Sequence, residues 1–340
     1  MTSFEIDRRP VIHTLLSLAP PDGTTRFVDQ LTVEAPIASR FSFFSWRTAL
    51  LGRYDVFHVH WPEFLLRSPH LPVRLVRAAL FAAFMLRLKV ARIPVVRTLH
   101  NLKPHESGTA LEKKLLAWCD ALTTLDVRLN EDTPPRKKPL RTILHGHYIG
   151  RFSVDQRSAS TQGRLLYFGL IRPYKGVERL IEVFSELRAE GLSLRILGNP
   201  TSELRTLVER ACVTDQRVSS DLRFVPDDVL GNELQLAELV ILPYKEMHNS
   251  GAVLVALSLS RPVLVPRSRS NELLAAEVGA GWIYMYDGDL SVPIIEHAVN
   301  QVRSCDRPHG APLLSKRDWA VVADQHYLAY ADAMKLAGKE

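Results

Sequence analysis

Short apolar runs alternate with amphipathic stretches along most of the chain. In the second half, residues 165–168 form a continuous apolar run that predicts a buried strand. Apolar side chains then recur at helical spacing before Gly191, at Val177, Leu180, Ile181, Phe184 and Leu187. Other apolar runs predict strands over 11–19, 54–59, 93–99, 121–125, 142–144, 194–197, 222–225, 239–243 and 261–266. Strands that alternate with helices predict an α/β protein with parallel, doubly wound sheets.

The length of the chain predicts two domains. A chain of 340 residues suits two domains of about 150–170 residues each. Residues 153–163 are polar and rich in Ser, Arg and Gln, a composition typical of a linker. We therefore expect one domain over 1–153 and a second over 164–318, followed by a helix over 319–336.

The composition predicts a globular protein of a reducing compartment. Hydrophobic residues make up 46% of the chain and charged residues 24%, as in soluble domains. Cys119, Cys212 and Cys305 are odd in number and far apart, which argues against a disulfide framework or a metal cluster. The apolar run 11–19 is too short and too poorly flanked for a secretion signal. We expect a cytoplasmic protein.

Positive charge is concentrated in the first half. Residues 1–150 hold 21 Lys and Arg against 13 Asp and Glu, a net charge of +8, whereas residues 151–340 hold 22 against 24, a net charge of −2. The first half is therefore expected to contact an anionic surface: a membrane, a phosphorylated lipid or a nucleic acid. Few aromatic residues interleave with the cations, which argues against nucleic acid.

One predicted helix, over 71–92, has an apolar centre between basic ends. Its centre, 78–86, is wholly apolar and is flanked by Arg74, Arg77, Arg87, Lys89 and Arg92. Nine apolar residues cannot span a bilayer. Either the helix lies on a membrane with its cations on anionic head groups, or it is a buried crossover helix of the sheet. Both alternatives fit the pattern.

Two strand-to-helix turns in the second half suit an anionic ligand. After the strand 165–168 come Gly169, then Arg172 and Lys175 on either side of a Pro–Tyr pair, and then a helix. Two cations beside the free N–H groups of a helix start form a diphosphate clamp, although a turn with two solvated cations gives the same pattern. Ser250 and Gly251 begin a strongly apolar helix and provide a second candidate anion site.

Titratable side chains cluster after three predicted strands of the first half. The clusters are HVHWPE at 58–63, HNLKPHE at 100–106 and HGHY at 145–148. Ligands of open α/β sheets bind at the carboxyl ends of strands. The His-x-His pair suggests a metal, but no firm third ligand is present, so we expect no metal site. Gly23 and Thr24 follow the first strand and either present N–H groups to an anion or form a solvated turn.

The order of these motifs resembles a known family. FGLIRPYKG, ILGNP, FVPDD, LVILPY and NSGAVLVALSLSRPVLVP, over about residues 164–285, resemble the donor half of GT-B glycosyltransferases. HVHWPE, TLHNLKPHE and ILHGHY resemble bacterial mannosyltransferases of polysaccharide assembly, which act on lipid-diphosphate-linked oligosaccharides. The resemblance implies two Rossmann-like domains that face a central cleft, with residues 319–340 packed back on the first domain.

The resemblance also implies roles for individual residues. The donor diphosphate would meet Arg172, Lys175, Ser250, Gly251 and Gly169, and His100 would lie beside the transferred sugar. The Glu-x7-Glu signature of this group is absent, because its positions fall near Met247 and at Val255, so Glu272 is a substitute candidate for the ribose. The other nucleoside candidates are Gly198, Asn199 and Val225, and the acceptor-side candidates are Gly23, Thr24, His60, Trp61, Asn101, His145 and His147.

The expected activity is transfer of a hexose, with mannose favoured, from a nucleotide sugar, with GDP favoured. The expected acceptor is a lipid-diphosphate-linked saccharide at the cytoplasmic face of the membrane, bound through residues 71–92. Two cations and a helix start would neutralise the leaving group without a metal or cofactor. An inverting enzyme would need a general base, for which Glu63, His100 and His105 are candidates. The alternative is a non-catalytic module that binds a nucleotide sugar or an anionic lipid.

Overall fold

The protein is divided into two compact units. A computed structural model describes residues 9–20, 26–100, 108–152, 160–245, 251–305 and 310–339. The first unit comprises Met1–Gly146 and Lys316–Glu340, and the second comprises His147–Ser315. The predicted linker, 153–163, falls within the range of the second unit, and residues 153–159 lie outside the described part.

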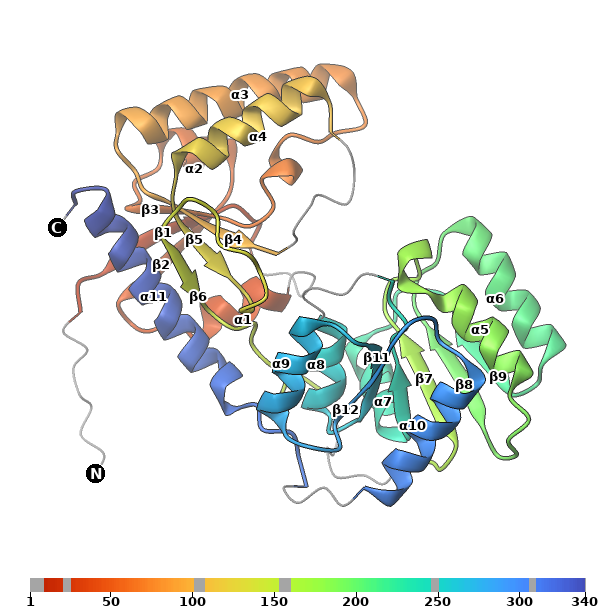
Figure 1. The fold of residues 1–340 in the computed structure, drawn as a ribbon. Coiled ribbons are helices and arrows are strands. Elements are labelled where there is room, and N and C mark those ends of the chain that lie inside the picture. The colour runs from red at the N-terminus through yellow and green to blue at the C-terminus, as the bar shows by residue number, and fades with distance from the viewer. Residues whose placement is uncertain are drawn as a thin grey trace, which may run out of the picture. The chain divides into compact units, whose positions relative to one another are not determined.

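The first unit is built on a six-stranded sheet of order β2-β1-β3-β4-β5-β6, in which all neighbours are parallel (Figure 1). Its strands are β1 Ile12–Leu16, β2 Ser39–Phe43, β3 Val56–Val59, β4 Val95–Leu99, β5 Thr123–Arg128 and β6 Leu140–Thr142. Its helices are α1 Arg26–Val33, α2 Trp46–Leu51, the 3-10 helix η1 Pro62–Leu65, α3 Leu71–Val90, α4 Ala110–Leu122 and α11 Trp319–Leu336.

Helices cover both faces of this sheet because successive strand residues point to opposite sides. Phe57 packs with α2, α3 and α4 in one hydrophobic cluster, whereas its neighbour Val56 packs with α1 and α11 in another. Val95 and Val96 divide between the two clusters in the same way. The sheet is therefore buried on both faces, as the prediction of a doubly wound sheet requires.

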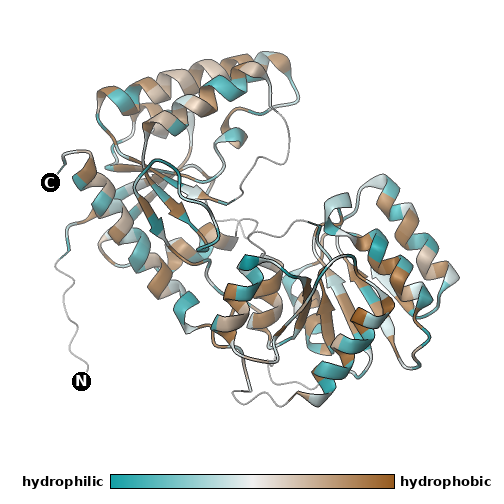
Figure 2. Cartoon of the chain, viewed as in Figure 1, coloured by the Kyte–Doolittle hydropathy of each residue, from teal (hydrophilic) through white to brown (hydrophobic). Residues whose placement is uncertain are grey.

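The second unit repeats the plan, with a parallel sheet of order β12-β11-β10-β7-β8-β9. Its strands are β7 Arg164–Phe168, β8 Ser193–Leu197, β9 Val218–Asp221, β10 Leu239–Ile241, β11 Val263–Pro266 and β12 Ile283–Tyr286. Its helices are η2 Pro173–Lys175, α5 Val177–Glu186, α6 Ser202–Thr214, α7 Asp227–Leu236, α8 Gly251–Ser258, α9 Arg269–Val278 and α10 Val292–Ser304, and η3 Ser315–Arg317 follows them. Its central strands are strongly apolar (Figure 2).

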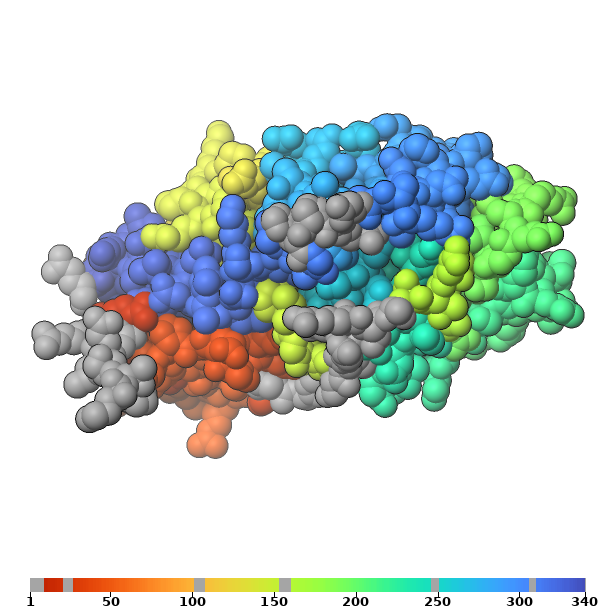
Figure 3. All heavy atoms as spheres, turned by 90° about the horizontal axis from the view of Figure 1, so that it is seen from below, coloured from red at the N-terminus to blue at the C-terminus, as the bar shows by residue number. Residues whose placement is uncertain are grey.

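The last helix, α11, belongs to the first unit. Its side chains Trp319, Val322 and Tyr330 are buried in the same cluster as Ile12 and Phe27. Figure 3 shows the dark blue surface of this helix against the orange surface of the early chain. The segment therefore completes one face of a sheet whose strands, from Ile12 to Thr142, come far earlier in the chain.

One predicted strand is wrong. Residues 222–225 were expected to form a strand, but β9 is Val218–Asp221 and the apolar pattern follows it. Phe224 is 73% exposed, whereas Leu222 and Val225 pack partly against the core from outside the strand. An edge strand such as β9, with the sequence VSSD, needs only one buried side chain and therefore leaves little hydrophobic signal.

The packing of α11 predicts the effect of truncating its core residues. Tyr330 is 1% exposed and Leu328, on the same helix, is 40% exposed. Tyr330→Ala should lower the free energy of unfolding of the first unit by about 3–5 kcal/mol, because a large cavity is left. Leu328→Ala, the control, should change it by less than about 0.5 kcal/mol. Amide hydrogen exchange of β3 and β4 measures both, and equal effects would contradict this packing.

Candidate active site

The second unit has a topological switch point between β7 and β10. From β7 the chain proceeds through α5 to β8 on one side, and from β10 it proceeds through α8 to β11 on the other. Loops leave such a point in opposite directions and open a crevice at the carboxyl ends of the strands. The residues after β7 include both predicted clamp cations, and those after β10 lead towards Gly251.

Two glycines allow these strand ends to approach closely. Gly176 has a left-handed conformation with φ of +70°, and a Cβ there would collide with the carbonyl oxygen of Pro243 after β10. Gly198, after β8, would collide in the same way with the carbonyl oxygen of Gly169, after β7. The start of α5 and the turns after three strands therefore meet at one place, which a side chain at either glycine would prevent.

Lys175 lies at these strand ends as a desolvated cation. Its Nζ is 3.8 Å from the centroid of the Tyr244 ring, a cation–π contact. Burial lowers the pKa of Lys175 from 10.5 to about 8. Among the described residues, no carboxylate lies within ion-pair distance of its Nζ. A nearby anion would therefore restore the stability of the charged form.

Arg172 is held in place by backbone carbonyl groups. Its Nη1 donates to the oxygen of Ile171 at 2.8 Å and to the oxygen of Asn199 at 2.9 Å. These bonds tie the turn after β7 to the turn after β8. Neither Arg172 nor Lys175 is thus a freely solvated surface cation, although the sequence alone allowed that alternative.

The sequence reasoning did not identify Tyr244 as a site residue. Its side chain is 4% exposed, and its Oη has no hydrogen-bond partner in the described part of the chain. Burial raises the pKa of Tyr244, so the hydroxyl remains a neutral donor. A Cβ placed on Gly169 would lie 3.8 Å from this oxygen. A buried tyrosine hydroxyl usually has a partner, and its position here suits an oxygen of a bound phosphate.

The other residues predicted to bind the nucleotide-sugar donor lie at several places in the second unit. Gly251 begins α8, and a Cβ there would lie 3.4 Å from the Tyr148 hydroxyl. Val225 is half-buried and packs against the hydrophobic core. Glu272 lies in the first turn of α9 and forms ion pairs with Arg267 at 3.4 Å and Arg269 at 3.6 Å. Ser250 lies outside the described residues.

In the first unit, the histidines from three predicted strand ends gather around one aromatic ring. The centroid of Phe27, on α1, lies 5.6 Å from His60, 5.6 Å from His100 and 5.2 Å from His145, each ring edge-on. His326 on α11 joins them at 6.0 Å. The participation of α1 and α11 could not be predicted from the strand-end motifs.

His60 and His100 are joined directly because β3 and β4 are neighbours. Nδ1 of His60 lies 2.9 Å from Nε2 of His100, within hydrogen-bond distance. The ring of Trp61 stacks on His100 with centroids 4.0 Å apart and planes 20° apart. His58 lies within β3 and is hydrogen-bonded to Thr98 and Tyr330. It therefore links β3 to β4 and to α11.

Burial keeps this histidine cluster neutral near pH 7. It lowers the pKa of His60 to about 3, and that of His145 and His326 to about 4. The pKa values of His58 and His100 are also well below the usual range, first because of burial and then because of neighbouring histidines. A neutral His100 can accept a proton or a hydrogen bond from a hydroxyl group.

Several predicted residues are not in this cluster or cannot be placed. Glu63 lies in η1 and is half-buried. His147 lies in the second unit, where its Nδ1 accepts from the N–H of Ile149 at 3.2 Å. Among the described residues, no group of His, Cys, Asp and Glu side chains could hold a metal ion. Gly23, Thr24, Asn101 and His105 lie outside the described residues.

Comparisons with known proteins agree with this architecture. Residues 162–296 match the family model of glycosyl transferases group 1. A GDP-mannose:glycolipid 4-beta-D-mannosyltransferase of Xanthomonas campestris pv. campestris is 47% identical over 327 residues, which cover 96% of this chain and 93% of that protein. A second sequence with the same name and pathovar is 48% identical over the same shares.

Solved structures with little sequence similarity share the fold. Anabaena Alr3699/HepE in complex with UDP has a TM-score of 0.63 at 13% identity, covering 95% of this chain and 100% of that one. WaaG, a glycosyltransferase involved in lipopolysaccharide biosynthesis, has a TM-score of 0.55 at 16% identity, covering 96% and 98%. These similarities confirm the prediction of a GT-B fold.

The buried histidines predict a specific dependence of stability on pH. Unfolding exposes His326, whose pKa then returns from about 4 to 6.5, so the unfolded chain binds an additional proton between these values. This contribution makes the protein lose stability as the pH falls from 6.5 towards 4. His326→Met should flatten the dependence by up to about 1.4 kcal/mol per pH unit.

Urea denaturation between pH 4 and 8 measures this effect. The exposed His297 on α10 provides the control, because His297→Gln leaves the buried cluster intact. An equal pH dependence in the wild type and His326→Met would contradict a neutral buried His326.

Proposed function

Because the chain belongs to the family of glycosyl transferases group 1, we propose that it transfers mannose from GDP-mannose to a lipid-linked saccharide. Its membership rests on 47% identity over 96% of its length. The protein is a nucleotide-sugar-dependent hexosyltransferase, and the alternative of a non-catalytic binding module is wrong. The identity of the donor and acceptor is the proposal.

The observation that carries the proposal is the pair of held cations at the switch point of the second unit. Departure of a nucleoside diphosphate leaves growing negative charge on its phosphate oxygens. Lys175 is desolvated and lacks a carboxylate partner among the described residues, Arg172 is anchored beside it, and the Tyr244 hydroxyl has no acceptor there. Such preorganised groups stabilise developing charge more strongly than water does.

The relatives support mannose and GDP as the transferred sugar and the base. Both are named GDP-mannose:glycolipid 4-beta-D-mannosyltransferases, and the similarity extends over both units. In GDP-mannose the sugar is held by an α bond, so a β-linked product requires inversion at the anomeric carbon. We infer inversion here as well, with a general base that takes the proton of the acceptor hydroxyl.

His100 is the candidate base that the geometry favours. Its Nε2 lies 2.9 Å from Nδ1 of His60, and burial lowers its pKa well below 6.5, which keeps the imidazole neutral and also makes it a weaker base. Glu63 and His105 remain the other candidates. Transfer would then proceed by attack of the acceptor oxygen on the anomeric carbon, as the bond to the diphosphate breaks and the base removes the hydroxyl proton.

The acceptor is proposed to be a lipid-diphosphate saccharide at the cytoplasmic face of a membrane. The relatives act on a glycolipid by name, and residues 1–150 carry the net charge of +8. No helix in the described residues is long and apolar enough to cross a bilayer. Peripheral binding through the first unit is therefore proposed, with about 1 kcal/mol from each cation near an anionic surface.

The proposed clamp predicts a large loss of transfer on removal of either cation. Arg172→Ala and Lys175→Ala each remove a charge-assisted contact worth roughly 1.5–3 kcal/mol. Mannose transfer from GDP-mannose to a glycolipid acceptor should fall at least tenfold, whereas unfolding should be little changed. Arg188→Ala, an exposed cation of the same unit, provides the control. Absence of transfer by the wild type would contradict the proposed function, and near-normal transfer by both variants would contradict the clamp.

The lowered pKa of Lys175 predicts weaker binding of GDP in alkaline solution. Below pH 8 the amine is charged and attracts the diphosphate, and above pH 8 the free protein loses this charge. The affinity for GDP should therefore fall as the pH rises from 8 to 9.5, by up to about tenfold per pH unit. Lys175→Arg keeps its charge and should show a much flatter profile. Calorimetric titrations of both proteins test this, and identical profiles would be inconsistent with a titrating Lys175.

A further inference from the structure

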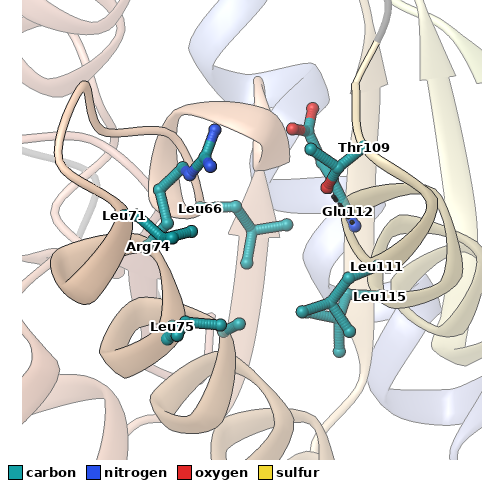
Figure 4. A pocket seen from close by; sticks show the side chains of 9 residues that line it. Leu66, Leu71, Arg74, Leu75, Thr109, Leu111, Glu112 and Leu115 are labelled. Carbon is teal, nitrogen blue, oxygen red and sulfur yellow. Dashed lines mark hydrogen bonds between the residues drawn. The ribbon is translucent and has the colours of Figure 1, made fainter.

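An apolar pocket lies between α3 and α4 of the first unit (Figure 4). It has a volume of about 230 Å³ and is lined by Leu66, Leu71, Arg74, Leu75, Ala78, Thr109, Leu111, Glu112 and Leu115. Leu71, Leu75 and Ala78 lie four and three residues apart and therefore share one face of α3. Figure 4 shows side chains of both helices on opposite sides of the space between them.

The mouth of this pocket is apolar and exposed. Leu71 is 56% exposed, Leu75 55% and Leu111 47%. Three exposed leucine side chains around one hollow differ from isolated surface leucines, and they indicate an interaction site.

Of the α3 residues that line the pocket, Ala78 packs partly against the core, whereas Leu71 and Leu75 are exposed and do not. Phe81, Phe84, Met85 and Leu88 are at most 1% exposed and bury the opposite, C-terminal part of the helix in the core. The helix is thus a packed crossover helix at one end and an exposed apolar surface at the other. The two alternatives for residues 71–92 are not exclusive.

Positive charge borders the pocket. Arg67 is paired with Glu112 at 2.9 Å, and Arg77 donates to the backbone oxygen of Arg67. Arg74 lines the pocket, and among the described residues its guanidinium forms no ion pair. Three arginines and one glutamate leave the rim with a net positive charge. Hydrocarbon-lined walls beneath a cationic rim match an anionic lipid, whose chain is apolar and whose phosphate is negative.

We propose that this pocket binds one acyl chain of an anionic bilayer phospholipid, with Arg74 on its phosphate. The inference rests on the proposed function, because it explains how the first unit is held at the membrane that contains the acceptor. Attraction to a charged membrane surface alone would need no such pocket. The proposal therefore adds a binding site for individual lipid molecules.

A soluble short-chain lipid tests the pocket apart from the membrane. Dihexanoyl phosphatidylglycerol, kept below its micellar concentration, should bind the wild type and raise its melting temperature by mass action. Glycerophosphoglycerol, the same head group without chains, should bind at least tenfold more weakly. Equal binding of the two compounds, or of neither, would overturn the proposal.

Matched variants of α3 test where the acyl chain of the lipid binds. Ala78→Phe fills the pocket and should weaken binding of dihexanoyl phosphatidylglycerol at least tenfold, whereas Ala79→Phe, at the exposed position next to it, should not. Arg74→Gln should weaken binding at least threefold, and Lys89→Gln, at the far end of the helix, should have no effect. If Ala78→Phe is unstable without lipid, Leu75→Gln provides the same test at an exposed position.

Further measurements separate the remaining outcomes. Tight binding of a short isoprenyl phosphate without binding of phosphatidylglycerol would overturn the proposal and assign the pocket to the acceptor tail. Sedimentation with phosphatidylglycerol vesicles at low salt should decrease at least fivefold in Ala78→Phe. Mannose transfer from GDP-mannose by the wild type is measured separately. Its absence alongside normal lipid binding would refute the proposed function, whereas normal transfer without lipid binding would refute the pocket.

Discussion

The parallel alignment of every strand pair is the constraint on which both candidate sites depend. Parallel strands deliver all their carboxyl ends to one edge of a sheet, so residues far apart in the chain meet there. In the second unit this edge holds Arg172, Lys175 and Tyr244, which follow two adjacent strands. In the first unit it holds His60 and His100, again after adjacent strands. Both sites are consequences of the same topology.

Desolvation lowers the pKa values of the cationic groups in both candidate sites. It leaves the lysine of the second unit charged at pH 7 and the histidines of the first unit neutral. Lys175 keeps its charge at pH 7 although burial lowers its pKa, so it gains from an incoming diphosphate. The histidines of the first unit have much lower ordinary pKa values, and burial makes them neutral at pH 7. The proposed function would use a cation that attracts phosphate in one unit and uncharged imidazoles in the other.

The helix α3 shows how one element can serve two environments. Its buried aromatic residues Phe81 and Phe84 pack in the core against the sheet, and its first two turns expose leucine side chains around a hollow. A helix that was apolar only to fill the core would not expose these residues beside α4. The cost of their exposure in water is offset if that surface contacts lipid.

The sequence by itself determined the α/β class, most strands and helices, and the clamp turn, because these depend on local periodicity and on residues close together in the chain. The helix over 319–336 was predicted to the residue. The polar edge strand β9 was misplaced, because a strand that is half exposed carries little apolar pattern.

Only the tertiary structure decided which distant residues meet. The contact of the Tyr244 ring with Lys175 depends on strand order. The convergence of His326 and Phe27 on the strand-end histidines depends on the packing of α11. Tertiary packing also decided that the histidines are neutral, because a pKa follows from burial and neighbours, and local sequence specifies neither.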